Sequence, residues 1–164
     1  MLASAMAVLI VTGGLLVGIP AYRQQIAVAE IERLSGNVEA RPRGPKWMRD
    51  LIGEKRMLAF DEVIEVKLRD TRAIDGTLVY VGRLAGLQRL WLANTRLTDA
   101  GLLHLISLTS LQELSLAETS VTDAGLLQLR ALPRLRWLYL GKTQITSAGA
   151  AELERVLPEL RIFM

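Results

Sequence analysis

The sequence predicts an α/β solenoid in which each 24-residue turn supplies one strand and one helix, preceded by a transmembrane helix. Three observations predict this architecture. Leucines recur with a period of 24 residues over residues 63–164. Within each period their spacing changes from two residues to three, so a strand gives way to a helix. Residues 1–22 contain no charged side chain.

The uncharged run at residues 1–22 is long enough for a membrane span, because about 20 apolar residues cross the hydrocarbon core of a bilayer. Tyr22 and Arg23 follow at once, as is typical of the membrane–water interface. We therefore expect a single-pass, uncleaved anchor. A cleaved signal peptide is the alternative, although its apolar region is usually about 7–15 residues behind a basic start, and this run has no Lys or Arg. The side of the membrane stays open.

Residues 23–62 predict a juxtamembrane helix and an N-terminal cap. Residues 24–34 are good helix formers, and Gly36 stands where a helix C-terminus is expected. Residues 37–41 fit a short strand, and residues 46–52 fit two helical turns. A repeat stack needs a cap over its first open face. We assign this role to residues 46–62 and expect Trp47 to lie in the core of the cap.

Residues 63–164 form the repeat region. Its units begin at Val63, Leu87, Leu111 and Leu135, and a partial unit begins at Leu160. In the second unit, Leu90 and Leu92 lie two residues apart, which places both on one face of a strand. Leu102 and Leu105 lie three apart and are followed by Leu108, which suits one face of a helix.

Threonines mark two places in the repeat. One set follows each strand at intervals of 24 residues, where a hydroxyl group can satisfy the backbone of a turn. We expect these residues to form a structural ladder: Thr71, Thr95, Thr119 and Thr143. Thr98 and Thr122 each precede Asp-Ala-Gly-Leu, and threonine followed by aspartate is favourable at a helix N-terminus.

The sequence T-D-A-G-L at residues 98–102 and 122–126 resembles repeats of the leucine-rich-repeat superfamily, especially bacterial and ribonuclease-inhibitor-like ones. The layout is also similar to short bacterial membrane-anchored members with a Gly-Pro-x-Trp segment, here residues 44–47. The resemblance implies a right-handed solenoid with parallel strands on a concave face and helices on a convex face. Many members carry asparagine where this chain has its threonine ladder.

Aromatic residues at outward strand positions suggest a binding surface, because aromatic and arginine side chains are enriched at interaction hot spots. The candidate partner-binding residues are Arg89, Trp91, Glu113, Trp137 and Tyr139. The alternative is that the rings pack on one another or on the C-terminal edge of the sheet.

The sequence favours no catalytic chemistry. It has no cysteine and one histidine, His104, which we expect to be a solvated helix residue. Metal sites and catalytic triads need several clustered groups, so we expect no enzyme, metal or cofactor. Positive and negative charges are mixed along the chain without the basic stripe of nucleic-acid binders.

These observations predict a membrane-anchored module that binds a protein or peptide on its concave face. The alternative is a structural protein that assembles with copies of itself at the membrane surface, through the open edge near residues 160–164. The identity of the partner stays open.

Overall fold

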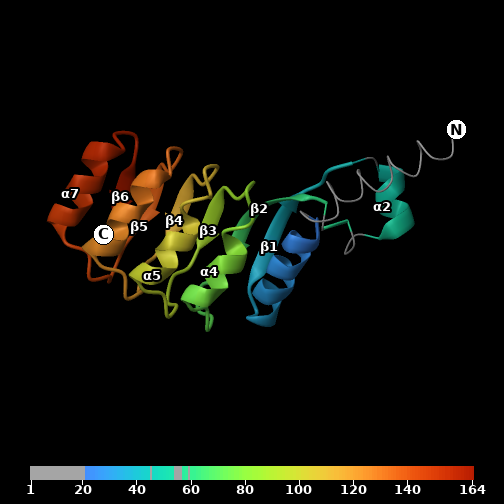
Figure 1. The fold of residues 1–164 in the computed structure, drawn as a ribbon, viewed down its shortest axis with the longest axis horizontal. Coiled ribbons are helices and arrows are strands. Elements are labelled where there is room, and N and C mark those ends of the chain that lie inside the picture. The colour runs from blue at the N-terminus through green and yellow to red at the C-terminus, as the bar shows by residue number, and fades with distance from the viewer. Residues whose placement is uncertain (1–20, 45, 54–56, 59) are drawn as a thin grey trace, which may run out of the picture.

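The computed structural model describes residues 21–44, 46–53, 57–58 and 60–164 (Figure 1). The anchor expected at residues 1–22 lies outside the described residues except for Ala21 and Tyr22. Within the described part of the chain, no helix combines the length and apolar character needed to cross a bilayer.

A single six-stranded sheet runs through the molecule, and its strands lie in the order of the sequence. The first two strands are antiparallel and every later pair is parallel. The strands are β1 (Asn37–Arg41), β2 (Glu62–Lys67), β3 (Arg89–Trp91), β4 (Glu113–Ser115), β5 (Trp137–Tyr139) and β6 (Arg161–Phe163). Each parallel pair keeps the 24-residue step of the sequence, as in the pairing of Leu90 with Leu114 and of Leu114 with Leu138.

Helical segments connect the parallel strands and cover one face of the sheet (Figure 1). They are α4 (Asp75–Val81), α5 (Asp99–Leu102), η1 (Leu103–Leu105), α6 (Asp123–Leu126), η2 (Leu127–Ala131) and α7 (Ser147–Val156). One strand and one helical segment per turn make this a leucine-rich-repeat-like α/β fold. In the two middle turns, a short α-helix continues as a 3₁₀-helix. The buried leucines spaced three residues apart span these parts, because Leu102 ends α5, Leu105 ends η1 and Leu108 follows it.

One continuous core lies between the sheet and the helical segments. Leu90, Leu114 and Leu138 point into it from neighbouring strands, and each is fully buried. Because each repeat covers the open side of the one before, the leucines that share a repeat position stack along the solenoid.

The N-terminal end of the core is covered by a helix over residues 21–33 and by β1. Ala27 and Ile31 of that helix are fully buried, and Met57 is buried as well. The side chain of Trp47, in α2 (Lys46–Ile52), is 64% exposed. The expectation that Trp47 would lie in the core of the cap was therefore wrong. The apolar faces of the first helix and β1 cover the end of the core that we had assigned to Trp47.

The threonine ladder fixes the turn after each strand. Each of its hydroxyl groups donates a hydrogen bond of 2.6–2.7 Å to the carbonyl oxygen three residues earlier. The residue before each threonine has a left-handed backbone, with φ between 53° and 60°. These residues are Asp70, Asn94, Glu118 and Lys142. The turn is thus the same in all four units, although the sequence marks its left-handed position with four different residues.

A second ladder joins the helix starts of neighbouring units. The carboxylate of Asp99 accepts hydrogen bonds from the backbone N–H (2.8 Å) and the hydroxyl (2.7 Å) of Thr122, one repeat later. Asp75 and Asp123 bind Thr98 and Thr146 in the same way. A Cβ atom added to Gly125 would collide with the carboxylate of Asp99. The repeated glycine is therefore needed for the close approach of the preceding aspartate.

Candidate functional site

The sheet face opposite the helical segments is called here the open face. Strand register arranges its side chains in two rows across the sheet. The first row contains Glu65, Arg89, Glu113, Trp137 and Arg161, and the second contains Lys67, Trp91, Ser115, Tyr139 and Phe163. All five predicted binding residues belong to these rows, so the predicted candidates do share one surface.

Glu65 organises the β2–β3 end of the open face. Its buried carboxylate accepts hydrogen bonds from Arg89 Nε (3.1 Å) and Nη2 (2.7 Å) and from Trp91 Nε1 (2.7 Å). Lys67 Nζ forms a further ion pair with Glu65 Oε1 at 3.3 Å. Burial raises the pKa of the Glu65 carboxyl, but the hydrogen bonds, above all that from Arg89, bring this pKa down to about 2. Arg89 and Trp91 are thus held in place by the protein itself.

Aromatic rings of the second row stack on one another. The ring centroids of Trp91 and Tyr139 are 5.9 Å apart, and those of Tyr139 and Phe163 are 5.0 Å apart. Ser115 lies on β4 between Trp91 and Tyr139 and is buried. Its small side chain allows rings from the strands on either side to meet. This stack is the arrangement that we gave as the alternative for the aromatic residues.

Tyr139 is also tied to the first row. Its hydroxyl donates a hydrogen bond of 3.1 Å to Glu113 Oε1. Burial, and then the hydrogen bond to Glu113, raise the pKa of Tyr139 above its usual value. The hydrogen bond to Glu113 and the stacking on Trp91 and Phe163 hold the Tyr139 ring in one orientation.

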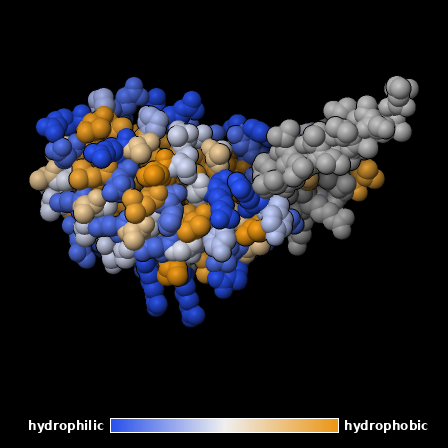
Figure 2. Space-filling view, in the orientation of Figure 1, coloured by the Kyte–Doolittle hydropathy of each residue, from blue (hydrophilic) through white to orange (hydrophobic). Residues whose placement is uncertain are grey.

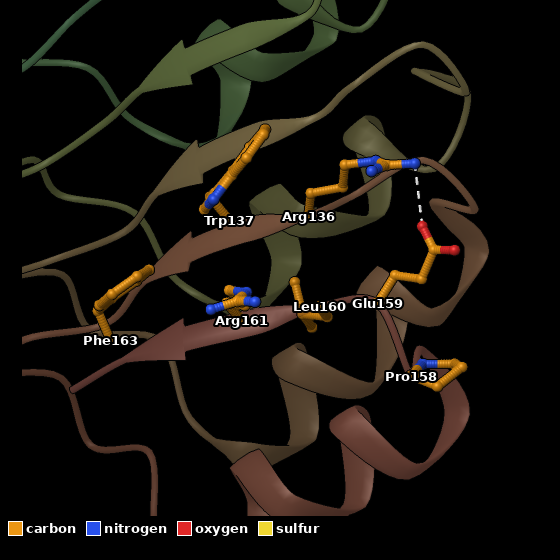
Figure 3. Close-up of a pocket in the computed structure, with 7 residues that line it drawn as sticks. All are labelled: Arg136, Trp137, Pro158, Glu159, Leu160, Arg161 and Phe163. Atoms are coloured by element: carbon orange, nitrogen blue, oxygen red, sulfur yellow. Dashed lines mark ion pairs between the residues drawn. The ribbon is translucent and has the colours of Figure 1, made fainter.

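Trp137 belongs to a separate part of the open face. Its side chain is 38% exposed, and it borders a hollow of about 640 Å³ at the β6 end. Figure 3 shows Trp137, Arg161 and Phe163 on neighbouring strands around this hollow. The Phe163 side chain is 47% exposed.

The two arginines of the hollow differ in their partners. Arg136 pairs with Glu159 at 2.9 Å (Figure 3). Arg161 makes no ion pair with the residues that the structure describes. An exposed indole, an exposed phenyl ring and an uncompensated guanidinium therefore meet at this end of the open face.

The structure connects four of the five predicted residues and leaves Trp137 apart, because the rings of Trp91 and Tyr139 stack. It brings Arg89 and Trp91 together around Glu65, and it joins Glu113 to Tyr139. The prediction missed Phe163 and Arg161, although both lie one 24-residue step beyond Tyr139 and Trp137. The period itself was the signal that could have identified them.

Metal-ligating side chains are scattered through the described ranges. Among those residues, no three His, Cys, Asp or Glu side chains come together as a possible metal site. His104 lies exposed on η1. On the helix-covered face, hydrophobic residues alternate with hydrophilic ones (Figure 2).

Solved structures similar to this one include a leucine-rich-repeat protein. No family model matches the chain, and no curated protein sequence matches it. The structure is similar to that of a leucine-rich-repeat protein from Leptospira interrogans, with a TM-score of 0.36 and 19% sequence identity. The match covers 52% of this chain and 27% of that protein, so the matched part spans about a quarter of its neighbour's length.

Proposed function

We propose that this chain is a membrane-tethered repeat module that binds a protein or peptide on its open face, at the β6 end. The observation that carries this proposal is the group formed by Trp137, Phe163 and Arg161 around the open hollow. Large apolar rings are costly to leave in water. Aromatic and arginine side chains also supply a large share of binding energy at protein interfaces.

The rest of the open face supports this group as a rigid base. The hydrogen bonds of Glu65 and the ring stack of Trp91, Tyr139 and Phe163 hold their side chains before any partner arrives. A surface that is already ordered loses less conformational entropy on binding. Such a base favours recognition of a partner segment that fits the existing shape.

The tether in this proposal is the uncharged run at residues 1–22. It would make the protein a single-pass membrane protein, with the repeat region close to the bilayer. The proposal includes no catalytic step, metal or cofactor.

A pull-down tests the proposed binding face. The full chain is crosslinked in native membranes and recovered as wild type, as Trp137→Ala/Arg161→Ala, and as Leu103→Ala/Leu127→Ala. The last variant removes exposed leucines from the helix-covered face and serves as the matched control. We expect a partner that is lost in the first variant and kept in the control. Equal recovery of that partner in all three proteins would contradict binding at the open face.

Self-assembly is the second candidate function, and β6 is the observation that favours it. Within the described residues, β6 has a strand partner only on its β5 side. An unpaired strand edge beside exposed Phe163 can pair with another chain. Sedimentation of the full chain in detergent separates the two functions. A monomer argues against self-assembly, and a dimer that Phe163→Ser dissociates supports it.

A further inference from the structure

Positive charge is concentrated in one short segment near the N-terminal end. Residues 41–56 contain six Lys or Arg and two Asp or Glu, a net charge of +4. The whole chain carries +3, so all other residues together carry −1. Arg41 and Arg43 pair with Glu62, and Arg49 pairs with Asp61, so residues 41–62 together carry six positive and four negative charges, a net charge of +2. A basic segment of this kind attracts anionic surfaces.

The same segment exposes large apolar side chains. Trp47 is 64% exposed and Leu51 is 76% exposed, and both lie on α2. They are four residues apart, so they share one face of the helix. This face has no counterpart in the repeat units and contributes nothing to the described core.

The opposite side of α2 is fixed to the body of the protein. Arg49 donates hydrogen bonds to both carboxylate oxygens of Asp61, at 2.6 and 3.0 Å, and one of 3.4 Å to the carbonyl of Arg43. Asp61 is buried and also accepts a hydrogen bond from the backbone N–H of Arg43. Arg49 thus holds α2 so that Trp47 and Leu51 face outward.

The uncharged run enters the described structure at this same end. Ala21 and Arg23, which follow it directly, border a hollow of about 700 Å³ together with Arg43 and Phe60. Tyr22 is exposed beside them. Figure 1 places α2 at the end of the molecule where the first helix begins. A membrane reached by residues 1–20 would therefore lie close to α2.

We infer that α2 forms a second membrane contact, in which Trp47 and Leu51 enter the interface of a bilayer containing anionic lipids. Lys46, at the start of α2, would bind a lipid phosphate. Tryptophan favours the membrane interface, and basic residues add attraction to anionic headgroups. This inference rests on the tether of the proposed function, which would keep α2 near the surface. The contact would fix the orientation of the repeat stack on the membrane.

Fluorescence quenching by brominated lipids tests the contact. The full chain is reconstituted into phosphatidylcholine vesicles with brominated acyl chains, with or without phosphatidylglycerol. We expect stronger quenching of tryptophan fluorescence in the anionic vesicles. Trp47→Phe should remove this difference, whereas Trp137→Phe should keep it. Lys46→Glu should weaken the contact about fivefold or more.

Flotation of the same vesicles separates failure of this inference from failure of the tether. If the protein floats with the vesicles but Trp47→Phe changes no quenching, the second contact is absent and the tether stands. If the protein floats with neither vesicle, both the tether and the contact are wrong. Equal quenching in neutral and anionic vesicles would overturn the role of the basic residues.

Discussion

At the scale of single residues, the open face is organised by side chains that the sequence does not mark as special. Trp91 and Tyr139 are recognisable as outward strand residues from the alternation of the strand. The stacking of their rings cannot be recognised from the sequence, because it depends on the small, buried Ser115 between them. Glu65 looks like any exposed strand residue, yet its burial follows from Arg89 and Trp91 binding it from the next strand.

Glu65 gives a prediction on pH. Its folded pKa of about 2 lies below the ordinary value of 4.5, so its contribution to stability is present above pH 4.5 and is lost as the pH falls towards 2. Charged hydrogen bonds of this kind contribute about 2 kcal/mol. Urea unfolding is measured at several pH values. At pH 6 the free energy of unfolding of the wild type should exceed that of Glu65→Gln by about this amount. The gap should close by pH 2, and a constant gap would contradict the assignment.

Lys142 gives a prediction on backbone strain. Its φ of 59° is unfavourable for most side chains, whereas asparagine adopts this conformation readily. Its exposed ion pair with Glu118 contributes little. Lys142→Asn should therefore increase the free energy of unfolding by about 0.5 kcal/mol. Lys142→Gln removes the same charge without this benefit and is the control. A larger gain for glutamine would exclude the backbone explanation.

At the scale of elements, the resemblance to leucine-rich repeats implied parallel strands, and the period of 24 residues predicted one strand and one helix in each unit. It did not predict the division of the middle helical segments into α and 3₁₀ parts. The ladder from each aspartate to the next threonine was also missed, because T-D-A-G was interpreted only as a helix start. The glycine in that motif was the available signal, since a helix start alone does not need one.

Gly125 tests the ladder between units. In Gly125→Ala, the new Cβ atom would displace the carboxylate of Asp99 and break its hydrogen bonds to Thr122. We expect a loss of about 2 kcal/mol in urea unfolding. Gly76→Ala is the matched control, because its Cβ atom would meet only a side-chain atom of Ile74 at 4.0 Å. Because alanine is more favourable than glycine in a helix, Gly76→Ala should increase the free energy of unfolding by up to about 1 kcal/mol. Similar losses in both variants would rule out the close approach.

At the scale of the whole molecule, the repeat region could be predicted from the sequence because every unit repeats the same spacing of leucine and threonine residues. The N-terminal end has no repeated pattern of this kind. Trp47 was assigned to the core on its size alone, whereas Ile31 and Ala27 fill that position. Among the described residues, large apolar side chains are therefore exposed at α2 and at the β6 end of the open face, as well as on the helix-covered face.

The central claim is that the β6 end of the open face binds a partner. Site-specific photo-crosslinking tests it most directly, with the photoreactive amino acid placed at Trp137 or, as a control on the helix-covered face, at Leu127. We predict a crosslinked partner from position 137 that position 127 does not give, and that Arg161→Glu weakens. Identical products from both positions, or products containing only this protein, would contradict a partner-binding role for the open face.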